Sequence, residues 1–139
     1  MAKIKNYKNI NFFNKEFLKR SLKKFLKSKN LFERINIHNS EKDSVHIMLM
    51  FYKKKFQYPP HYSINKTESF TVLKGKFKII FYGKNKKPNK TIILDKNNVL
   101  TYKLNKNIYH QIIPLNNHCI ALEVLDGPYI KNSVKKINE

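Results

Sequence analysis

Three residues of this chain have side chains that bind metal ions and move protons, and each lies in or beside a strand-like stretch. His61 follows Pro59 and Pro60, Glu68 precedes an apolar run, and His110 lies inside an alternating run. Two imidazoles and one carboxylate form the donor set of zinc and ferrous sites that keep positions open for substrate or water. The sequence therefore predicts that His61, Glu68 and His110 converge on one divalent ion, which could be iron, manganese, nickel or zinc.

The elements that must position these residues are strands, because apolar and polar residues alternate through most of the chain after Leu31. The run 45–52 places His46, Met48, Met50 and Tyr52 on one face and apolar residues on the other, so we expect both of its faces to be covered. Short strands separated by polar turns indicate an all-β sandwich or barrel. The predicted strands are 31–38, 45–52, 69–73, 76–82, 91–95, 99–104, 108–115 and 119–125.

One helix is expected ahead of the strands. Between residues 14 and 27 the apolar positions recur at spacings of three and four, and Asn14 is a suitable N-cap. We expect its single apolar stripe to pack on the sheet. The predicted organisation is an N-terminal arm and amphipathic helix over residues 1–30, a barrel over 31–130 and a loosely held basic tail over 131–139.

The net charge of +20 raises the question of a nucleic-acid partner. Only Arg20 and Arg34 among the 29 basic residues are arginine, the residue that base-edge and bidentate phosphate recognition favours. The lysines are spread over the whole chain beside abundant asparagine and isoleucine, a composition that AT-rich codon usage produces. We predict no specific nucleic-acid partner, and leave open polyanion binding and weak association with anionic membrane surfaces.

The location of the protein is predicted from what the sequence lacks. No apolar run approaches the roughly 18 residues that span a bilayer, and the N-terminus has no apolar signal-peptide region. A single cysteine, Cys119, excludes a disulfide within the chain. We therefore expect a cytoplasmic protein without membrane insertion.

The spacing around His61 resembles the first motif of the cupins. That motif is glycine, five residues, His-x-His, three or four residues, glutamate, six residues, glycine. His61, Glu68 and Gly75 occupy three of its positions, whereas Ser63 replaces the second histidine and Lys55 the leading glycine. Only His110 matches the second cupin motif.

The flanking segments narrow this resemblance to the WbuC-type cupin metalloproteins. The similarity covers roughly residues 14–130 and is most specific in 60–61, 67–75 and 123–129. It implies a double-stranded β-helix, that is, a cupin or jelly-roll barrel, with one N-terminal α-helix. It also implies a metal-binding protein associated with surface-polysaccharide biosynthesis. Because edge strands of such barrels often pair between subunits, we expect a homodimer.

Several residues acquire expected roles from the motif and its surroundings. The metal ligands would be His61, Glu68 and His110, one imidazole fewer than the usual cupin set. Glu123 shares a strand face with Cys119 and is a further candidate for an inward-facing site group. The expected catalytic residues are His61, Tyr62 and Glu68, and the expected substrate-binding residues are His38, Ser63 and Tyr109.

Three functional hypotheses stay open at this point. The first is a metal-dependent enzyme that acts on a small carbohydrate-derived or oxo-acid molecule in the barrel. The second is a metal-free enzyme like the cupin-fold sugar-nucleotide ketoisomerases and epimerases, with His61 as base and Tyr62 or Tyr109 as acid. The third is a non-catalytic module that binds a small molecule and has lost the metal.

Overall fold

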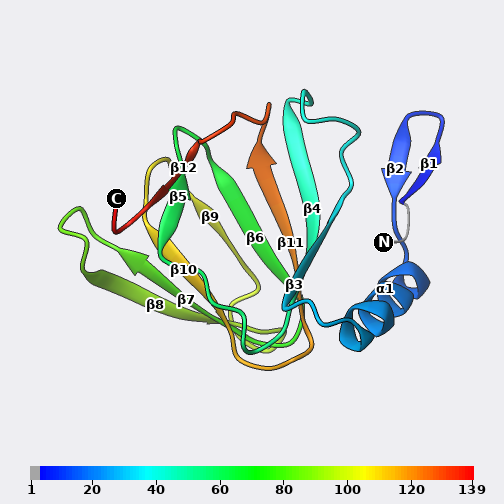
Figure 1. The fold of residues 1–139 in the computed structure, drawn as a ribbon, viewed down its shortest axis with the longest axis horizontal. Helices are drawn as coiled ribbons and strands as arrows, with labels where there is room; N and C mark the ends of the chain where they lie inside the picture. The colour runs from blue at the N-terminus through cyan, green and yellow to red at the C-terminus, as the bar shows by residue number, and fades with distance from the viewer. Residues whose placement is uncertain (1–3) are drawn as a thin grey trace.

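The computed structural model describes residues 4–139, so the first three residues of the predicted N-terminal arm lie outside it. Two five-stranded antiparallel sheets face each other, and a single helix lies against the outside of one of them (Figure 1). This arrangement is the predicted all-β double-stranded β-helix with one N-terminal helix. Within residues 4–139 no helix is long and apolar enough to cross a bilayer.

The first sheet, here called the His sheet because it holds His61 and His110, has the strand order β12-β5-β10-β7-β8. Its central pairing joins β10 and β7 in register from His110 opposite Phe81 to Pro114 opposite Phe77. The strands are β5 (His61–Ser63), β7 (Phe77–Tyr82), β8 (Pro88–Leu94), β10 (His110–Pro114) and β12 (Val134–Lys136).

The second sheet, here called the Glu sheet because it holds Glu68 and Glu123, has the order β3-β4-β11-β6-β9. Its long central strands β4 and β11 pair along their whole length, from Cys119 opposite Tyr52 to Asp126 opposite Val45. The strands are β3 (Phe32–Asn36), β4 (Val45–Tyr52), β6 (Glu68–Lys74), β9 (Thr101–Leu104) and β11 (Cys119–Asp126).

The two faces of the Glu sheet bury different sets of apolar side chains. Met48, Met50 and Tyr52 of β4 point between the sheets and pack with Phe70 and Phe77. The alternate residues of β4 point outward and meet the helix. Both faces of β4 are therefore covered, as the alternation of apolar residues predicts.

Helix α1 (Lys15–Lys27) supplies the outer layer. Asn14 caps it by accepting a hydrogen bond from the Phe17 backbone N–H at 2.9 Å, which confirms the predicted N-cap. Phe17 and Phe25 are buried against Leu49 of β4, so hydrophobic burial fixes the helix on the sheet.

Two terminal segments contain strands that the sequence did not predict. Near the N-terminus, β1 (Lys5–Tyr7) and β2 (Ile10–Phe12) form a hairpin that is drawn above the helix in Figure 1. Near the C-terminus, β12 pairs with β5, for example Lys136 opposite His61. The last residues are therefore not the loose tail expected from their charge, because their backbone groups complete the edge of the His sheet.

Candidate functional site

The two histidines of the motif are neighbours across the His sheet. His61 on β5 and His110 on β10 are directly opposite each other, and their ring centroids are 4.8 Å apart. Residues opposite each other in an antiparallel pair project to the same face. The strand pairing thus brings together two imidazoles that are far apart in the sequence.

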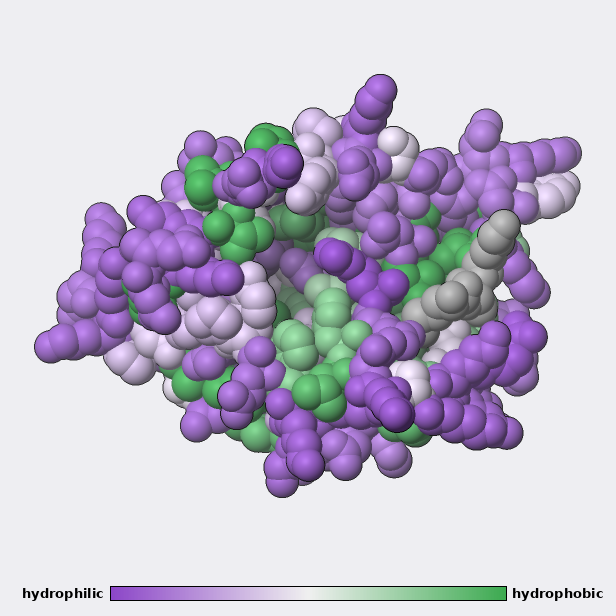
Figure 2. Space-filling view, in the orientation of Figure 1, coloured by the Kyte–Doolittle hydropathy of each residue, from purple (hydrophilic) through white to green (hydrophobic). Residues whose placement is uncertain are grey.

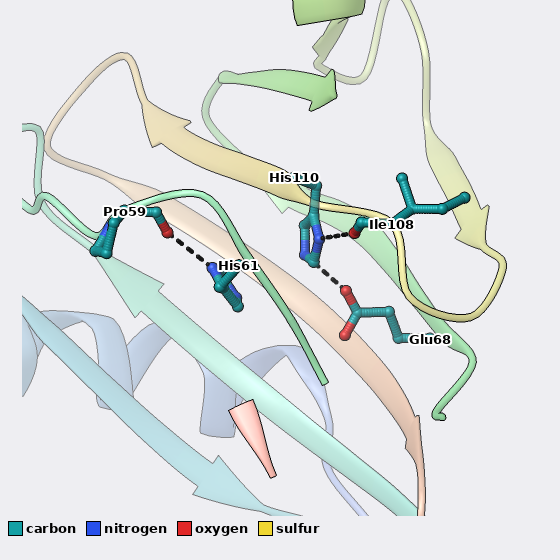
Figure 3. A network of polar contacts seen from close by, with 5 residues as sticks. All are labelled: Pro59, His61, Glu68, Ile108 and His110. Carbon is teal, nitrogen blue, oxygen red and sulfur yellow. Dashed lines mark hydrogen bonds and ion pairs between the residues drawn. The ribbon is translucent and has the colours of Figure 1, made fainter. Parts of the chain in front are cut away.

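Glu68 reaches this pair from the opposite sheet. It begins β6 and is buried, and its Oε1 lies 2.7 Å from Nε2 of His110, a residue that is itself only 1% exposed (Figure 3). The two sheets are therefore joined by a direct, buried polar contact. The structure brings together the three residues that the cupin-like spacing selected.

The backbone fixes the tautomer of each histidine. Nδ1 of His61 lies 3.0 Å from the carbonyl oxygen of Pro59, and Nδ1 of His110 lies 3.2 Å from that of Ile108 (Figure 3). A carbonyl only accepts, so each Nδ1 carries the proton and donates it. Nε2 of each neutral ring is left as a lone-pair acceptor.

Burial keeps the contact between His110 and Glu68 neutral. Desolvation is the largest cause that lowers the pKa of His110, and it is also the largest cause that raises the pKa of Glu68. An ion pair at this distance would shift both pKa values the other way, so desolvation dominates over Coulomb attraction here. Both shifts favour the neutral form of the pair, in which the Glu68 carboxyl group donates its hydrogen to Nε2 of His110.

Two more ionisable groups of the Glu sheet face this contact. Glu123 on β11 hydrogen-bonds to Glu68, and burial followed by the Glu68 charge raises its pKa well above its ordinary value. Tyr102 on β9 also has a strongly raised pKa, caused first by burial and then by Glu68 and Glu123. The sequence marked Glu123 only as a possible inward group, and Tyr102 was missed because its alternation marks a strand but not a site.

His61 is a further neutral group of the site. Its pKa is lowered to about 4, chiefly by burial and then by the neighbouring His110. The site thus holds two neutral imidazoles beside two carboxyl groups with raised pKa values. Buried groups whose pKa values are shifted by desolvation in this way are typical of sites that transfer protons.

The remaining residues with predicted roles lie elsewhere or at the edge of the site. The rings of Tyr62 and Tyr109 contact each other, with centroids 4.7 Å apart. Tyr62 follows the inward-facing His61 and Tyr109 precedes the inward-facing His110, so both tyrosines project to the outer face of the His sheet. Ser63 shares the face of His61. His38 stacks on His46 at 4.0 Å and bonds to Ile47, away from the cluster. The structure does not bring Tyr62, Tyr109 or His38 to the histidine and glutamate pair.

The donors do not yet surround a common point. Within residues 4–139 no group of three or more His, Cys, Asp or Glu side chains is placed to hold a metal ion. Glu68 and His110 contact each other directly, whereas Figure 3 marks no contact between His61 and Glu68. The chemical types of these three side chains suit a divalent ion. Their positions, however, give a contacting pair, His110 and Glu68, with the ring of His61 nearby.

Comparison with known proteins identifies the family. A family described as a domain of unknown function (DUF6016) matches residues 13–94. The chain belongs to this family. The matched part of this DUF6016 protein contains His61 and Glu68, whereas His110 and Glu123 lie beyond it. No curated protein matches the chain.

Solved structures show which fold this family member has. Oxalate oxidase in complex with the substrate analogue glycolate matches with a TM-score of 0.60 and 12% identity, over 80% of this chain and 57% of that one. CapF with an inhibitor matches with a TM-score of 0.63 and 15% identity, over 78% and 33%. KdgF from Halomonas sp. matches with a TM-score of 0.58 and 10% identity, over 76% and 87%.

These similarities support the cupin fold and nothing finer. The chain spans little more than half of oxalate oxidase and a third of CapF, and its identity to all three is low. Activity and ligand therefore have to be argued from the side chains of this chain.

Proposed function

We propose that this protein binds a small carbonyl compound between its two sheets and moves a proton on it with His110 and Glu68. The observation that carries the proposal is the 2.7 Å contact between Nε2 of His110 and Oε1 of Glu68, combined with the bond of His110 Nδ1 to Ile108. A neutral imidazole with its lone pair toward a protonated carboxyl group is a base next to an acid.

The proton transfer follows from these two positions. When a carbonyl compound replaces the direct contact, Nε2 of His110 accepts the proton of the carbon next to the carbonyl. The electron pair of that C–H bond forms the new C=C bond, and the carbonyl oxygen takes the proton of Glu68. The products are an enol, an imidazolium and a carboxylate, and hydrogen bonds from neighbouring groups stabilise both charged side chains.

The Ile108 and Pro59 carbonyls act as positioning groups in this scheme. The Ile108 carbonyl holds the ring of His110, at 3.2 Å from Nδ1, and stabilises the imidazolium that forms. His61, held in the same way by Pro59, presents a second lone pair on the same face. Glu123 hydrogen-bonds to Glu68 and fixes the orientation of that carboxyl group.

The substrate class follows from the family resemblance and the acid–base pair together. The similarity to WbuC-type cupins supports a carbohydrate-derived molecule linked to surface-polysaccharide synthesis, and enolisation is the step that ketoisomerases and epimerases share. A homodimer and a cytoplasmic location are further predictions from the sequence.

The proposal is tested by proton exchange with solvent. The protein is incubated in deuterated buffer with pyruvate, dihydroxyacetone or glyceraldehyde, and NMR follows the loss of the proton next to the carbonyl. We expect exchange with at least one compound, and its loss in His110→Gln and Glu68→Gln. His118→Gln, at an exposed histidine, is the matched control and should keep the activity. Exchange at the buffer rate for all three compounds would instead favour a non-catalytic binding module.

Divalent metal binding is a second candidate, favoured by the two histidine tautomers. Because both Nδ1 atoms donate to backbone carbonyls, each Nε2 atom carries the lone pair that a metal ligand needs, an arrangement usual for metal-binding histidines. His61, His110 and Glu68 are the residues that would hold the ion. A bound divalent ion would act as a Lewis acid toward a carbonyl oxygen. Metal content after purification, in wild type and in His110→Ala, tests this candidate independently of activity.

A further inference from the structure

Tyr102 carries a buried hydroxyl group without a partner. Its oxygen has almost no exposed surface and no hydrogen bond within the described part of the chain. The ring is held between Phe70, at 5.9 Å, and Phe81, at 5.1 Å. An unsatisfied buried hydroxyl is costly to a folded protein, so its persistence requires a reason.

The position of Tyr102 points to that reason. Strand pairing aligns Met48, Glu123, Phe70 and Tyr102 in one row across the inner face of the Glu sheet. Glu68 lies two residues before Phe70 on the same face of β6, and it contributes to the raised pKa of Tyr102. The free hydroxyl thus lies beside the acid–base pair.

Arg34 is a second residue whose hydrogen-bond donors are largely without acceptors within the described residues. It lies opposite Met50 on the edge strand β3, and its guanidinium contacts the sulfur of the buried Met48 at 3.7 Å. Within residues 4–139 it forms no ion pair with a carboxylate, although its charge reaches inward to Tyr52 and Glu123. A thioether uses almost none of the five N–H donors of arginine.

These groups lie below an opening of the surface. Tyr102 and Glu123 each keep part of their surface exposed, although the Tyr102 hydroxyl oxygen itself is enclosed. Figure 2 shows a hollow near the centre of the face on which Figure 1 looks between the two sheets. Apolar surface (green) dominates the hollow, and hydrophilic side chains border it. A small ligand with polar groups at its ends suits such a lining.

We propose that Tyr102 and Arg34 are specificity residues of this site and select a small anion that carries a second oxygen, such as a 2-oxo acid. The Tyr102 hydroxyl hydrogen-bonds to the carbonyl oxygen next to Glu68, and the Arg34 guanidinium binds the carboxylate at the opening. This assignment rests on the proposed binding of a small molecule between the sheets and specifies its chemical class.

Two probes of similar shape separate the two contacts. Pyruvate carries both a carboxylate and a carbonyl oxygen, whereas isobutyrate keeps the carboxylate and has a methyl group in place of that oxygen. Dissociation constants are measured by NMR titration for wild type, Tyr102→Phe and Arg34→Met. We expect Tyr102→Phe to weaken pyruvate binding about tenfold and to leave isobutyrate unchanged, and Arg34→Met to weaken both about tenfold or more.

Matched variants control for the substitutions themselves. Tyr82→Phe removes a hydroxyl that bonds to Gln111, and Arg20→Met removes an exposed helix arginine. Both variants should bind the two probes like wild type. Thermal unfolding is a second measurement. Tyr102→Phe deletes an unsatisfied buried hydroxyl and should raise the melting temperature of the ligand-free protein. If the hydroxyl had a structural role, the same substitution would lower the melting temperature.

The outcomes decide the assignment without depending on catalysis. Pyruvate binding that Tyr102→Phe or Arg34→Met leaves unchanged overturns it, as does a wild type that binds neither anion. A lowered melting temperature in Tyr102→Phe also overturns it, because the hydroxyl would then have a structural partner. Pyruvate binding that depends on both residues, without proton exchange, supports this assignment and contradicts only the proposed proton transfer.

Discussion

The low pKa of His61 predicts how the stability of the protein depends on pH. In the folded state burial and His110 lower this pKa to about 4, from an ordinary value of 6.5. At pH 7 the ring is neutral in both states. At pH 5 the unfolded chain takes up a proton that the folded state does not, so stability is lost as the pH falls below 6.5.

The size of this loss follows from the two pKa values. Linkage through a folded pKa of about 4 and an unfolded pKa of 6.5 gives a decrease of about 2 kcal/mol in the unfolding free energy between pH 7 and pH 5. Glu68 and Glu123 act in the opposite direction, because their raised pKa values destabilise the fold as the pH rises. Their contribution has to be separated from that of His61.

The variant His61→Gln makes that separation. Glutamine does not titrate, and its amide can still donate to the Pro59 carbonyl, while the glutamates and His110 stay in place. Unfolding free energies are measured by urea denaturation at pH 7 and pH 5, with a chelator present at both. We expect the wild type to lose about 2 kcal/mol more than the variant over this range. Parallel pH profiles of the two proteins would show that His61 is not buried as a neutral ring, and would refute the reasoning.

Three further predictions concern the scaffold and the metal. In Gly75→Ala the new methyl would lie 2.8 Å from Asn116 Oδ1 at a φ of +79°, so urea denaturation should show a loss of more than about 2 kcal/mol; a loss near zero contradicts this geometry. Phe25→Ala should cost about 3–5 kcal/mol, against under about 1 kcal/mol for Leu31→Ala at an exposed site; equal losses contradict helix packing. If a divalent ion binds, chelation should lower the melting temperature in wild type but not in His110→Ala, and an unchanged wild-type melt argues against the ion.

Hydrophobic periodicity and capping residues were sufficient to predict the helix and one long strand of this chain. Helix α1 begins after the predicted cap Asn14, and β4 has the predicted bounds, with both faces covered. The short strands β5 and β12 were missed because three residues carry too little periodicity to predict a strand. The hairpin near the N-terminus was missed for the same reason.

The motif spacing by itself also selected His61, Glu68 and His110, and the fold of the chain brings them together. Their chemical roles stay predictions. What the sequence could not determine was which other side chains share the space between the sheets. Tyr62 and Tyr109 were chosen for their closeness in sequence to the histidines, yet adjacent residues of a strand project to opposite faces.

Only the tertiary structure placed Glu123 and Tyr102 beside the acid–base pair, and Arg34 against Met48 at the edge of the same sheet. Each lies on a different strand, and its neighbours are decided by the register of pairings such as Glu123 with Phe70 and Phe70 with Tyr102. A shift of one residue in any of these pairings would turn the side chain to the other face. The sequence thus determined the strands and the three motif residues, whereas strand register determined which groups surround them, because register depends on contacts between segments far apart in the chain.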